Sequence, residues 1–352
     1  MEKILTVVIP TYNMEKYLDR CLSSLVVEPD WMDRLEVLVV NDGSKDRSSA
    51  IAHGYESKYP RTFKVIDKEN GNYGSCVNAG IQQALGKYFR ILDADDWFDT
   101  EDFFSFLKKL STSDADLIFT DYTECIVGGE TVRRCMPEAM LENVTYDTSA
   151  FMSFALNYYF QMHRMTYKRQ VLVDSETVLQ EGISYTDTEY CFYPIRKVLT
   201  MERVNLSPYQ YMVGRIGQSM SDEALKKSLW QLRKVLEALI IFYERHIEDM
   251  AEAVKVTSWK YVEGKLMLYY SFLLSEFKRD VSLDEEMRRM DSFLGNHAFF
   301  YTLTDNFTHN RIHYVRVWRK WSLYNTFFFF QFNNWCWKKI KVVVDWKKSL
   351  SS

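Results

Sequence analysis

Three carboxylates follow directly on a short apolar strand, and this combination restricts the fold more than any other feature of the chain. The strand is expected over residues 88–92, and Asp93, Asp95 and Asp96 come directly after it. Crowded carboxylates beside an apolar strand repel one another and are costly to desolvate, so a cation must offset them. Mg2+ or Mn2+ bridging to substrate phosphates would do so, because these ions take oxygen ligands. The alternative is a turn in which Asp95 or Asp96 caps a helix over residues 97–110.

The first 120 residues alternate apolar strands with helices, which predicts an α/β fold with a doubly wound, mostly parallel sheet. Strands are expected over residues 4–9, 35–40, 63–66, 88–92 and 116–120, and helices over residues 14–26, 46–58, 75–85 and 97–110. Ligands of such sheets lie beyond the carboxyl ends of the strands. Polar clusters follow three of these ends, at residues 10–13, 41–44 and 93–96. The sequence therefore predicts a ligand site at this edge of the sheet.

Beyond residue 120 the pattern changes. Residues 121–134, with two adjacent glycines at their centre, predict a β-hairpin. From about residue 221, apolar residues recur at three- and four-residue spacing, which predicts helices over residues 222–245, 249–277 and 283–294. This change of period indicates a domain boundary near residue 220.

Composition excludes several classes of protein. The net charge of −4 argues against a nucleic-acid partner. The six cysteines contain no Cys-x-x-Cys pair, which argues against zinc or a disulfide framework and for a reducing, cytoplasmic compartment. The sequence has no signal-peptide pattern and no apolar run long enough for a spanning helix. Both common glycine-rich phosphate loops are absent, so a bound nucleotide would need a metal at its phosphates.

Four ordered motifs resemble the family 2 inverting glycosyltransferases of the GT-A fold. They are Val-Val-Ile-Pro-Thr-Tyr-Asn at residues 7–13, Val-Val-Asn-Asp-Gly-Ser at 39–44, Asn-Ala-Gly-Ile at 78–81 and Leu-Asp-Ala-Asp-Asp-Trp at 92–97. The resemblance implies a GT-A catalytic domain over residues 1–220, with a nucleotide-binding half (1–120) and an acceptor half (121–220). A helical C-terminal region, residues 221–352, would follow.

The resemblance also implies a reaction. A sugar would move from a nucleoside-diphosphate sugar, UDP-linked, to a saccharide or lipid-linked saccharide in cell-surface polysaccharide or glycan synthesis. Asp42 is similar to the carboxylate that contacts the nucleotide base, with Pro10, Thr11 and Asn13 as the wall of that pocket. From the residues alone, Asp42 is either this contact or an Asx turn.

The family's D-x-D motif corresponds to the carboxylate cluster. The resemblance implies that Asp95 is the main ligand of Mn2+ or Mg2+, with Asp93 on the ribose or metal side and Asp96 as a further ligand.

Two later residues complete the implied site. Asp187 is similar to the catalytic base, and Arg215 to an element that closes over the diphosphate. Thr186 stands where the family usually has Glu, so the supporting carboxylate is missing or is replaced by Glu189. The alternatives are a helix N-cap for Asp187 and a surface position for Arg215. His163 is either a metal or acceptor contact or a structural residue.

The C-terminal segment has an unusual composition. Residues 311–348 hold nine Lys or Arg, one acid and five of the nine Trp of the chain. Basic residues interleaved with Trp and Phe suit an anionic membrane surface, which would make the enzyme peripheral on the inner face of the cell membrane. The alternative is a packed helix whose lysine stems cover the catalytic domain.

Two other functions stay open. Nucleotidylyl transfer also uses strand-end carboxylates and a metal, but its usual glycine-rich, lysine-containing N-terminal loop is absent. The non-enzymatic alternative is a catalytically decayed subunit that binds a nucleotide sugar or acts as a membrane scaffold, because Thr186 replaces the Glu of the base motif.

Overall fold

The computed structural model describes residues 2–215, 222–275, 281–309 and 312–321. They form two compact units, one of residues up to 231 together with 241–259, the other of residues 232–240 and those from 260 on. The division predicted near residue 220, with its two halves of the catalytic domain, stays a prediction.

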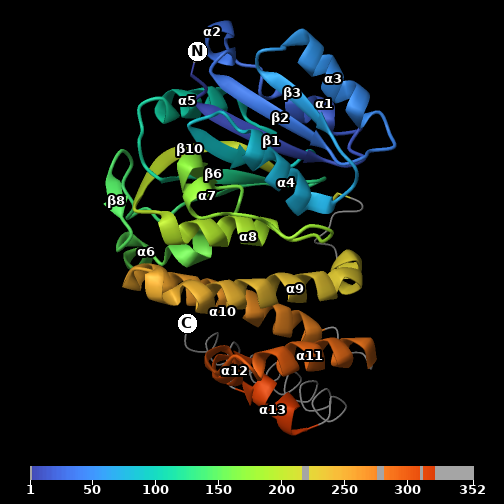
Figure 1. Ribbon diagram of the computed structural model, residues 1–352, viewed down its shortest axis with the longest axis vertical. Coiled ribbons are helices and arrows are strands. Elements are labelled where there is room, and N and C mark those ends of the chain that lie inside the picture. Colours follow the sequence, from blue (N-terminus) through green and yellow to red (C-terminus); the bar gives the residue numbers. More distant parts are fainter. Residues whose placement is uncertain (1, 216–221, 276–280, 310–311, 322–352) are drawn as a thin grey trace, which may run out of the picture. The chain divides into compact units, whose positions relative to one another are not determined.

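The first unit is built on one mixed sheet (Figure 1). Its strands are β1 (Leu5–Thr11), β2 (Leu35–Asn41), β3 (Phe63–Asp67), β4 (Tyr88–Ile91), β5 (Trp97–Phe98), β6 (Leu117–Ile126), β7 (Thr131–Arg134), β8 (Thr145–Asp147), β9 (Met165–Lys168) and β10 (Thr200–Val213). The order is β3-β2-β1-β4-β9-β6-β10-β5, with β7 on β6 and β8 on β10. Strands β1 to β4 are parallel, as are β6 and β10, whereas β9 and β5 run antiparallel to their neighbours. The predicted doubly wound, mostly parallel sheet is confirmed.

The helices of this unit follow the predicted alternation. They are α1 (Leu18–Ser23), α2 (Pro29–Met32), α3 (Ser48–Lys58), α4 (Asn72–Gln83), α5 (Thr100–Leu110), α6 (Ala150–Ser153), α7 (Arg169–Asp174) and α8 (Asp187–Phe192), with 3-10 turns η1 (Leu156–Tyr159) and η2 (Tyr193–Lys197). Helix α5 illustrates why they form, because its apolar residues recur on one face and are buried: Phe103, Phe106, Leu107 and Leu110. Burial of each such side chain contributes about 1.5–3 kcal/mol.

The start of α5 corrects one interpretation of the carboxylate cluster. Asp99 is the N-cap, and its side chain accepts a hydrogen bond from the backbone N–H of Asp102 at 2.9 Å. The two residues before it form β5 and pair with β10, so the helix begins at Thr100. The proposal that Asp95 or Asp96 caps this helix is therefore wrong, and their carboxylates need another explanation.

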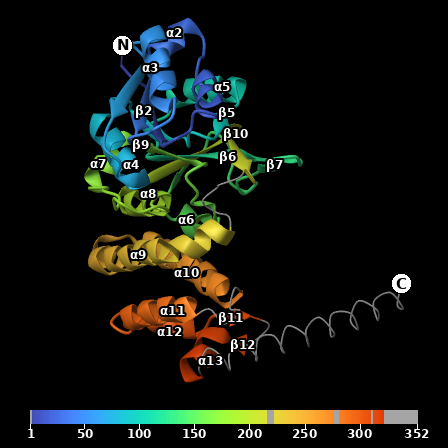
Figure 2. The ribbon, with the colours of Figure 1, turned by 90° about the vertical axis from the view of Figure 1, so that its right-hand side faces the viewer.

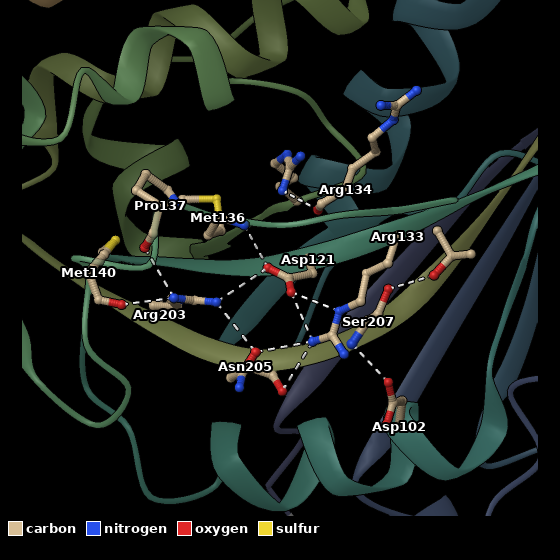
Figure 3. A network of polar contacts seen from close by, with 12 residues as sticks. Asp102, Asp121, Arg133, Arg134, Met136, Pro137, Met140, Arg203, Asn205 and Ser207 are labelled. Atoms are coloured by element: carbon tan, nitrogen blue, oxygen red, sulfur yellow. Dashed lines mark hydrogen bonds and ion pairs between the residues drawn. The ribbon is translucent and has the colours of Figure 1, made fainter. Parts of the chain in front are cut away.

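The predicted hairpin after β6 is confirmed and is held by a buried polar network (Figure 3). Asp121 accepts hydrogen bonds from Arg133 Nε at 2.9 Å and from the backbone N–H of Met136 at 2.8 Å. Arg203 of β10 donates to two backbone carbonyls of the loop after β7 at 3.1 Å each. Figure 2 shows the hairpin projecting beyond the rest of the sheet. The network fixes the base of this projection to β10.

The second unit is helical, as predicted for the C-terminal region. Helices α9 (Asp222–His246) and α10 (Glu252–Ser275) each contribute to both units, with η3 (Ile247–Asp249) between them. They are followed by α11 (Val281–Leu294), α12 (Ala298–Asp305), the short pair β11 (Thr308–His309) and β12 (Ile312–His313), and α13 (Tyr314–Lys320). In the described ranges, no helix is both long and apolar enough to cross a membrane.

The first part of the basic C-terminal segment is packed. In α13, Tyr314, Val315 and Trp318 are buried. Arg319 donates at 2.7 Å each to carboxylates of Asp291 in α11 and Asp305 in α12. Helix α13 is therefore packed on α11 and α12 of its own unit. Membrane contact and packing on the catalytic domain both stay predictions for this segment. The remainder of the segment, residues 322–348, lies outside the described residues.

Candidate active site

The loops that follow β1 and β2 are joined by hydrogen bonds. Pro10 and Thr11 end β1, and the Thr11 carbonyl accepts from the backbone N–H of Asp42 at 2.9 Å. The Asn13 side chain accepts from the backbone N–H of Lys45 at 2.8 Å. The structure therefore brings the predicted wall residues beside Asp42.

Asp42 is buried, and its carboxylate binds a distant loop. Its oxygens accept from the backbone N–H groups of Gly71 and Asn72 and from Lys68 Nζ, each at 2.9 Å. The turn after β2 is made instead by Asn41, whose side chain accepts from the Ser44 N–H at 3.2 Å. The Asx-turn interpretation of Asp42 is wrong, because its side chain organises the loop that opens α4.

The second carboxylate of the cluster, Asp95, is paired with a cation. Arg215 Nε lies 2.5 Å from Asp95 Oδ2, and both side chains are largely buried. Arg20 donates to the Asp95 carbonyl at 2.9 Å, which fixes the backbone at this point. Arg215 is thus not a simple surface residue, and a positive charge is stabilised at the carboxylate predicted to bind a metal.

Asp93 lies close to the other charged groups of the site. Burial, together with the negative charges of Asp95 and Asp187, raises its pKa to about 8. A hydrogen bond from the Tyr73 hydroxyl, 2.9 Å from Asp93 Oδ1, and the charge of Arg215 act in the opposite direction. These electrostatic effects on Asp93 place four predicted residues from three separate segments in one site: Asp93, Asp95, Asp187 and Arg215.

Asp96 has a different environment. It is buried, its Oδ2 accepts from the Tyr209 hydroxyl at 2.7 Å, and its Oδ1 accepts from the backbone N–H of Met212 at 2.8 Å. Burial raises its pKa well above the ordinary value for an aspartate. These contacts anchor the cluster to β10, a function that the sequence pattern did not reveal.

Asp187 is the first residue of α8, and its negative charge raises the pKa of Tyr73 and Tyr211, adding to the effect of burial. The helix N-cap is Thr186, which makes no capping hydrogen bond, so the N-cap interpretation of Asp187 is wrong. Tyr185 just before it has φ +66°, a strained conformation for a bulky residue.

Glu189 as the replacement for the missing glutamate of the base motif stays a prediction. It is buried and accepts from the backbone N–H and the side-chain amide of Gln180, at 2.8 and 2.5 Å. Thr186 Oγ1 is buried, and no described group pairs with it. The negative charge of Asp187 also raises the pKa of Glu189, although less than burial does.

His163 lies at the same site. One of its ring nitrogens and carboxylate oxygens of Asp93 and Asp96 all lie within 4.8 Å of one another, a grouping that could hold a metal ion. Burial, together with the charges of Arg90 and Arg164, lowers its pKa to about 3, so the imidazole is neutral near pH 7. Carboxylate oxygens with a neutral imidazole nitrogen are a donor set that suits Mn2+.

A buried arginine beneath the site was missed by sequence reasoning. Arg90 of β4 donates to the hydroxyls of Thr120 and Thr166 at 3.1 Å each, and also to the His163 carbonyl. Burial lowers its pKa to about 10. The available signal was a charged residue inside an otherwise apolar strand.

The comparisons with known proteins agree with this geometry. The family model described as Glycosyl transferase family 2 matches residues 6–175. Over these residues the chain is similar to glycosyltransferase family 2. Its relatives include the putative glycosyltransferase EpsH of Bacillus subtilis (strain 168), which is 36% identical over 117 residues, covering 33% of this chain and 33% of EpsH.

A further family member adds a biosynthetic context. The minor teichoic acid biosynthesis protein GgaB, also of Bacillus subtilis (strain 168), is 35% identical over 91 residues, covering 26% of this chain and 10% of GgaB. The chain spans about a third of the length of the first curated relatives that it matches, at 32% and 33%.

A solved structure of this kind supports the fold over most of the chain. S. aureus TarS 1–349 in complex with UDP-GlcNAc has a TM-score of 0.61 at 19% identity, covering 83% of this chain and 80% of that chain. At this identity the likeness concerns the fold alone. The protein therefore has the GT-A fold predicted from its motifs.

Proposed function

We propose that this protein transfers a sugar, with inversion, from a UDP-linked donor to a saccharide or lipid-linked saccharide in cell-surface polysaccharide or glycan synthesis. The observation that carries the proposal is the convergence of Asp93, Asp95, Asp187 and Arg215, whose charges act on one carboxyl group. TarS was solved with UDP-GlcNAc, and GgaB is named for teichoic acid biosynthesis, which supports the donor class and the pathway class.

The nucleotide would bind at the ends of β1 and β2. Asp42 would accept a hydrogen bond from the base while it holds the loop at Gly71 and Asn72, because a carboxylate oxygen can accept more than one bond. Pro10, Thr11 and Asn13 would form the adjoining wall.

The residues present fit a divalent metal. Asp95 would be the main ligand, with Asp93 beside it, because these carboxylates already stabilise the positive charge of Arg215. Asp96 is the third predicted ligand, although both of its oxygens accept hydrogen bonds in this structure. When bound, Mn2+ or Mg2+ would neutralise charge on the leaving diphosphate.

Asp187 would act as the general base. It would take the proton of the acceptor hydroxyl as that oxygen attacks the anomeric carbon from the face opposite the diphosphate, which inverts the centre. Arg215 would exchange its ion pair with Asp95 for contact with the diphosphate. Tyr73 would hold Asp93 in place through its hydrogen bond.

The test is UDP release from UDP-GlcNAc, UDP-glucose and UDP-galactose, with and without methyl glycosides as acceptors. We expect acceptor-stimulated release that chelator or Asp95→Ala abolishes. Full activity in excess chelator would exclude the metal assignment. A catalytically decayed subunit would bind a UDP-sugar and release no UDP under any condition.

A peripheral position on the cytoplasmic face of the membrane belongs to the same proposal. It now concerns residues 322–348, since α13 is packed through Arg319. The charge and Trp content of these residues support it.

A further inference from the structure

A rigid aromatic cluster surrounds His163 beside the carboxylates. The rings of Tyr122, Tyr209 and Tyr211 pack on the imidazole with centroid distances of 5.1, 4.8 and 4.4 Å. Buried Arg90 binds the carbonyl of His163. The imidazole is thus held from several sides, as expected for a group that recognises a ligand in a fixed orientation.

The hydroxyl groups of these tyrosines have different surroundings. The Tyr122 hydroxyl bonds to Glu124 at 3.2 Å, and that of Tyr209 donates to Asp96 at 2.7 Å. Tyr211 is only partly buried, and the pKa of its hydroxyl is raised by burial and then by the charges of the three clustered aspartates and of Asp187. The Tyr211 ring contacts the His163 ring, whose nitrogen lies within 4.8 Å of Asp93 and Asp96 oxygens, so Tyr211 lies beside the carboxylates.

His163 has hydrogen-bonding capacity to spare at this place. Its Nδ1 is buried, and the described part of the chain provides no partner for it. The side chain as a whole is partly exposed, and a ring nitrogen lies within 4.8 Å of Asp93 and Asp96 oxygens. An imidazole offers two ring nitrogens for hydrogen bonds, which matches a sugar hydroxyl.

We propose that His163 and Tyr211 form the floor on which the pyranose of the donor is recognised, and that they determine which sugar is transferred. This inference rests on the proposed function. Neither the family motifs nor the metal assignment gives His163 or Tyr211 a role in sugar recognition. The donor sugar is the favoured occupant because Asp93, proposed for the ribose or metal side, has a carboxylate oxygen within 4.8 Å of a His163 ring nitrogen.

The test compares Tyr211→Phe and His163→Phe with the wild type, using calorimetry with UDP, UDP-GlcNAc, UDP-glucose and UDP-galactose. Both variants keep an aromatic ring in the cluster. We expect the Kd for UDP to be unchanged. The preferred UDP-sugar should bind roughly tenfold more weakly, as expected for the loss of one or two hydrogen bonds. The Kd values of the three donor sugars should also differ less from one another than in the wild type.

Tyr122→Phe is the matched control. It removes a hydroxyl from the same aromatic cluster, but this hydroxyl bonds to Glu124. It should leave donor selectivity unchanged. Thermal melts of all variants would verify folding. If His163→Phe is destabilised, Tyr211→Phe still tests the inference, because it retains the ring.

Unchanged donor affinities and selectivity in folded Tyr211→Phe would overturn the inference, as would an equal loss of affinity for UDP and for UDP-sugars. A wild type that binds neither UDP nor any UDP-sugar would instead overturn the proposed function, and the inference with it.

Discussion

Arg215 directs its guanidinium onto Asp95, with 2.5 Å between Nε and Oδ2, and this pair joins the end of the described catalytic segment to the carboxylate proposed to bind metal. A guanidinium and a divalent ion would compete for the same oxygen atoms. Binding of the metal and nucleotide therefore requires Arg215 to change partners.

Arg215→Gln should strengthen Mn2+ binding in the absence of nucleotide while it weakens transfer. The substitution removes the competing cation and also the charge proposed to contact the diphosphate. We expect up to about tenfold tighter Mn2+ binding, measured by calorimetry or electron paramagnetic resonance. Arg34→Gln, at an exposed arginine that lies over Trp31, is the control. Weaker Mn2+ binding by Arg215→Gln would contradict the competition.

Asp42→Ala should weaken both nucleotide binding and the fold. It leaves the partly buried N–H groups of Gly71 and Asn72 without their acceptor, which costs about 1–3 kcal/mol of stability. Calorimetry with UDP and a denaturant melt would measure the two effects. Lys68→Met is the control, because it removes the ion pair and leaves the backbone contacts. If only the melt changes, Asp42 is a loop anchor and not a base contact.

Asp187→Asn should reduce transfer by about a hundredfold to ten-thousandfold with little change in donor affinity. The amide keeps the shape of the side chain and cannot accept the proton. Glu189→Gln is the comparison: it disturbs the bonds to Gln180, so it should lower the melting temperature. Single-turnover rates and thermal melts distinguish the two. Loss of chemistry in Glu189→Gln, with Asp187→Asn active, would move the base to Glu189.

His53 should make the fold slightly more stable in acid. Its pKa is raised from 6.5 by hydrogen bonds to Asp67 and then Glu56, both at 2.8 Å. Because the folded pKa is the higher one, this stabilisation is fully present below the unfolded value and is lost as pH rises through the folded value. These groups are exposed, so the effect is a few tenths of a kcal/mol.

The measurement is denaturant unfolding of His53→Gln and wild type at about pH 5 and about pH 9, on either side of the histidine range. The variant should be less stable than wild type only at the lower pH. Equal destabilisation at both values would mean that packing, and not charge, accounts for the contribution of His53.

Residues 322–348 should bind anionic vesicles. They contain five Lys, one Asp and three Trp, and attraction to anionic lipid is about 1 kcal/mol per basic residue near the surface. The intact protein should sediment with such vesicles, and less of it should do so in high salt. A protein truncated after Trp321, which keeps α13, should not sediment with them. Neutral vesicles are the control. No binding by the intact protein would end this part of the proposal.

The sheet and its polar edge were predictable because both are encoded locally. Each buried strand is a short apolar run, and each polar cluster follows its strand directly in the sequence. The start of α5 was not predictable in this way. β5 exists because Trp97 and Phe98 pair with Gln210 and Tyr209 of β10, more than a hundred residues away.

The environment of the site residues was also beyond the reach of the sequence pattern. The anchoring of Asp96 by Tyr209 depends on how β10 crosses the cluster. The neutrality of His163 depends first on its own burial and then on the charges of Arg90 and Arg164. Spacing along the chain contains no measure of either environment.

The loop that opens α4 has a consequence for binding energetics. Asp42 holds it at Gly71 and Asn72, and the next residue, Tyr73, bonds to Asp93. The end of the site proposed for the base and the end proposed for the sugar thus share one short segment of backbone. Ordering of this segment by either fragment of the donor would lower the entropic cost for the other, so uridine and a sugar phosphate should bind with positive cooperativity.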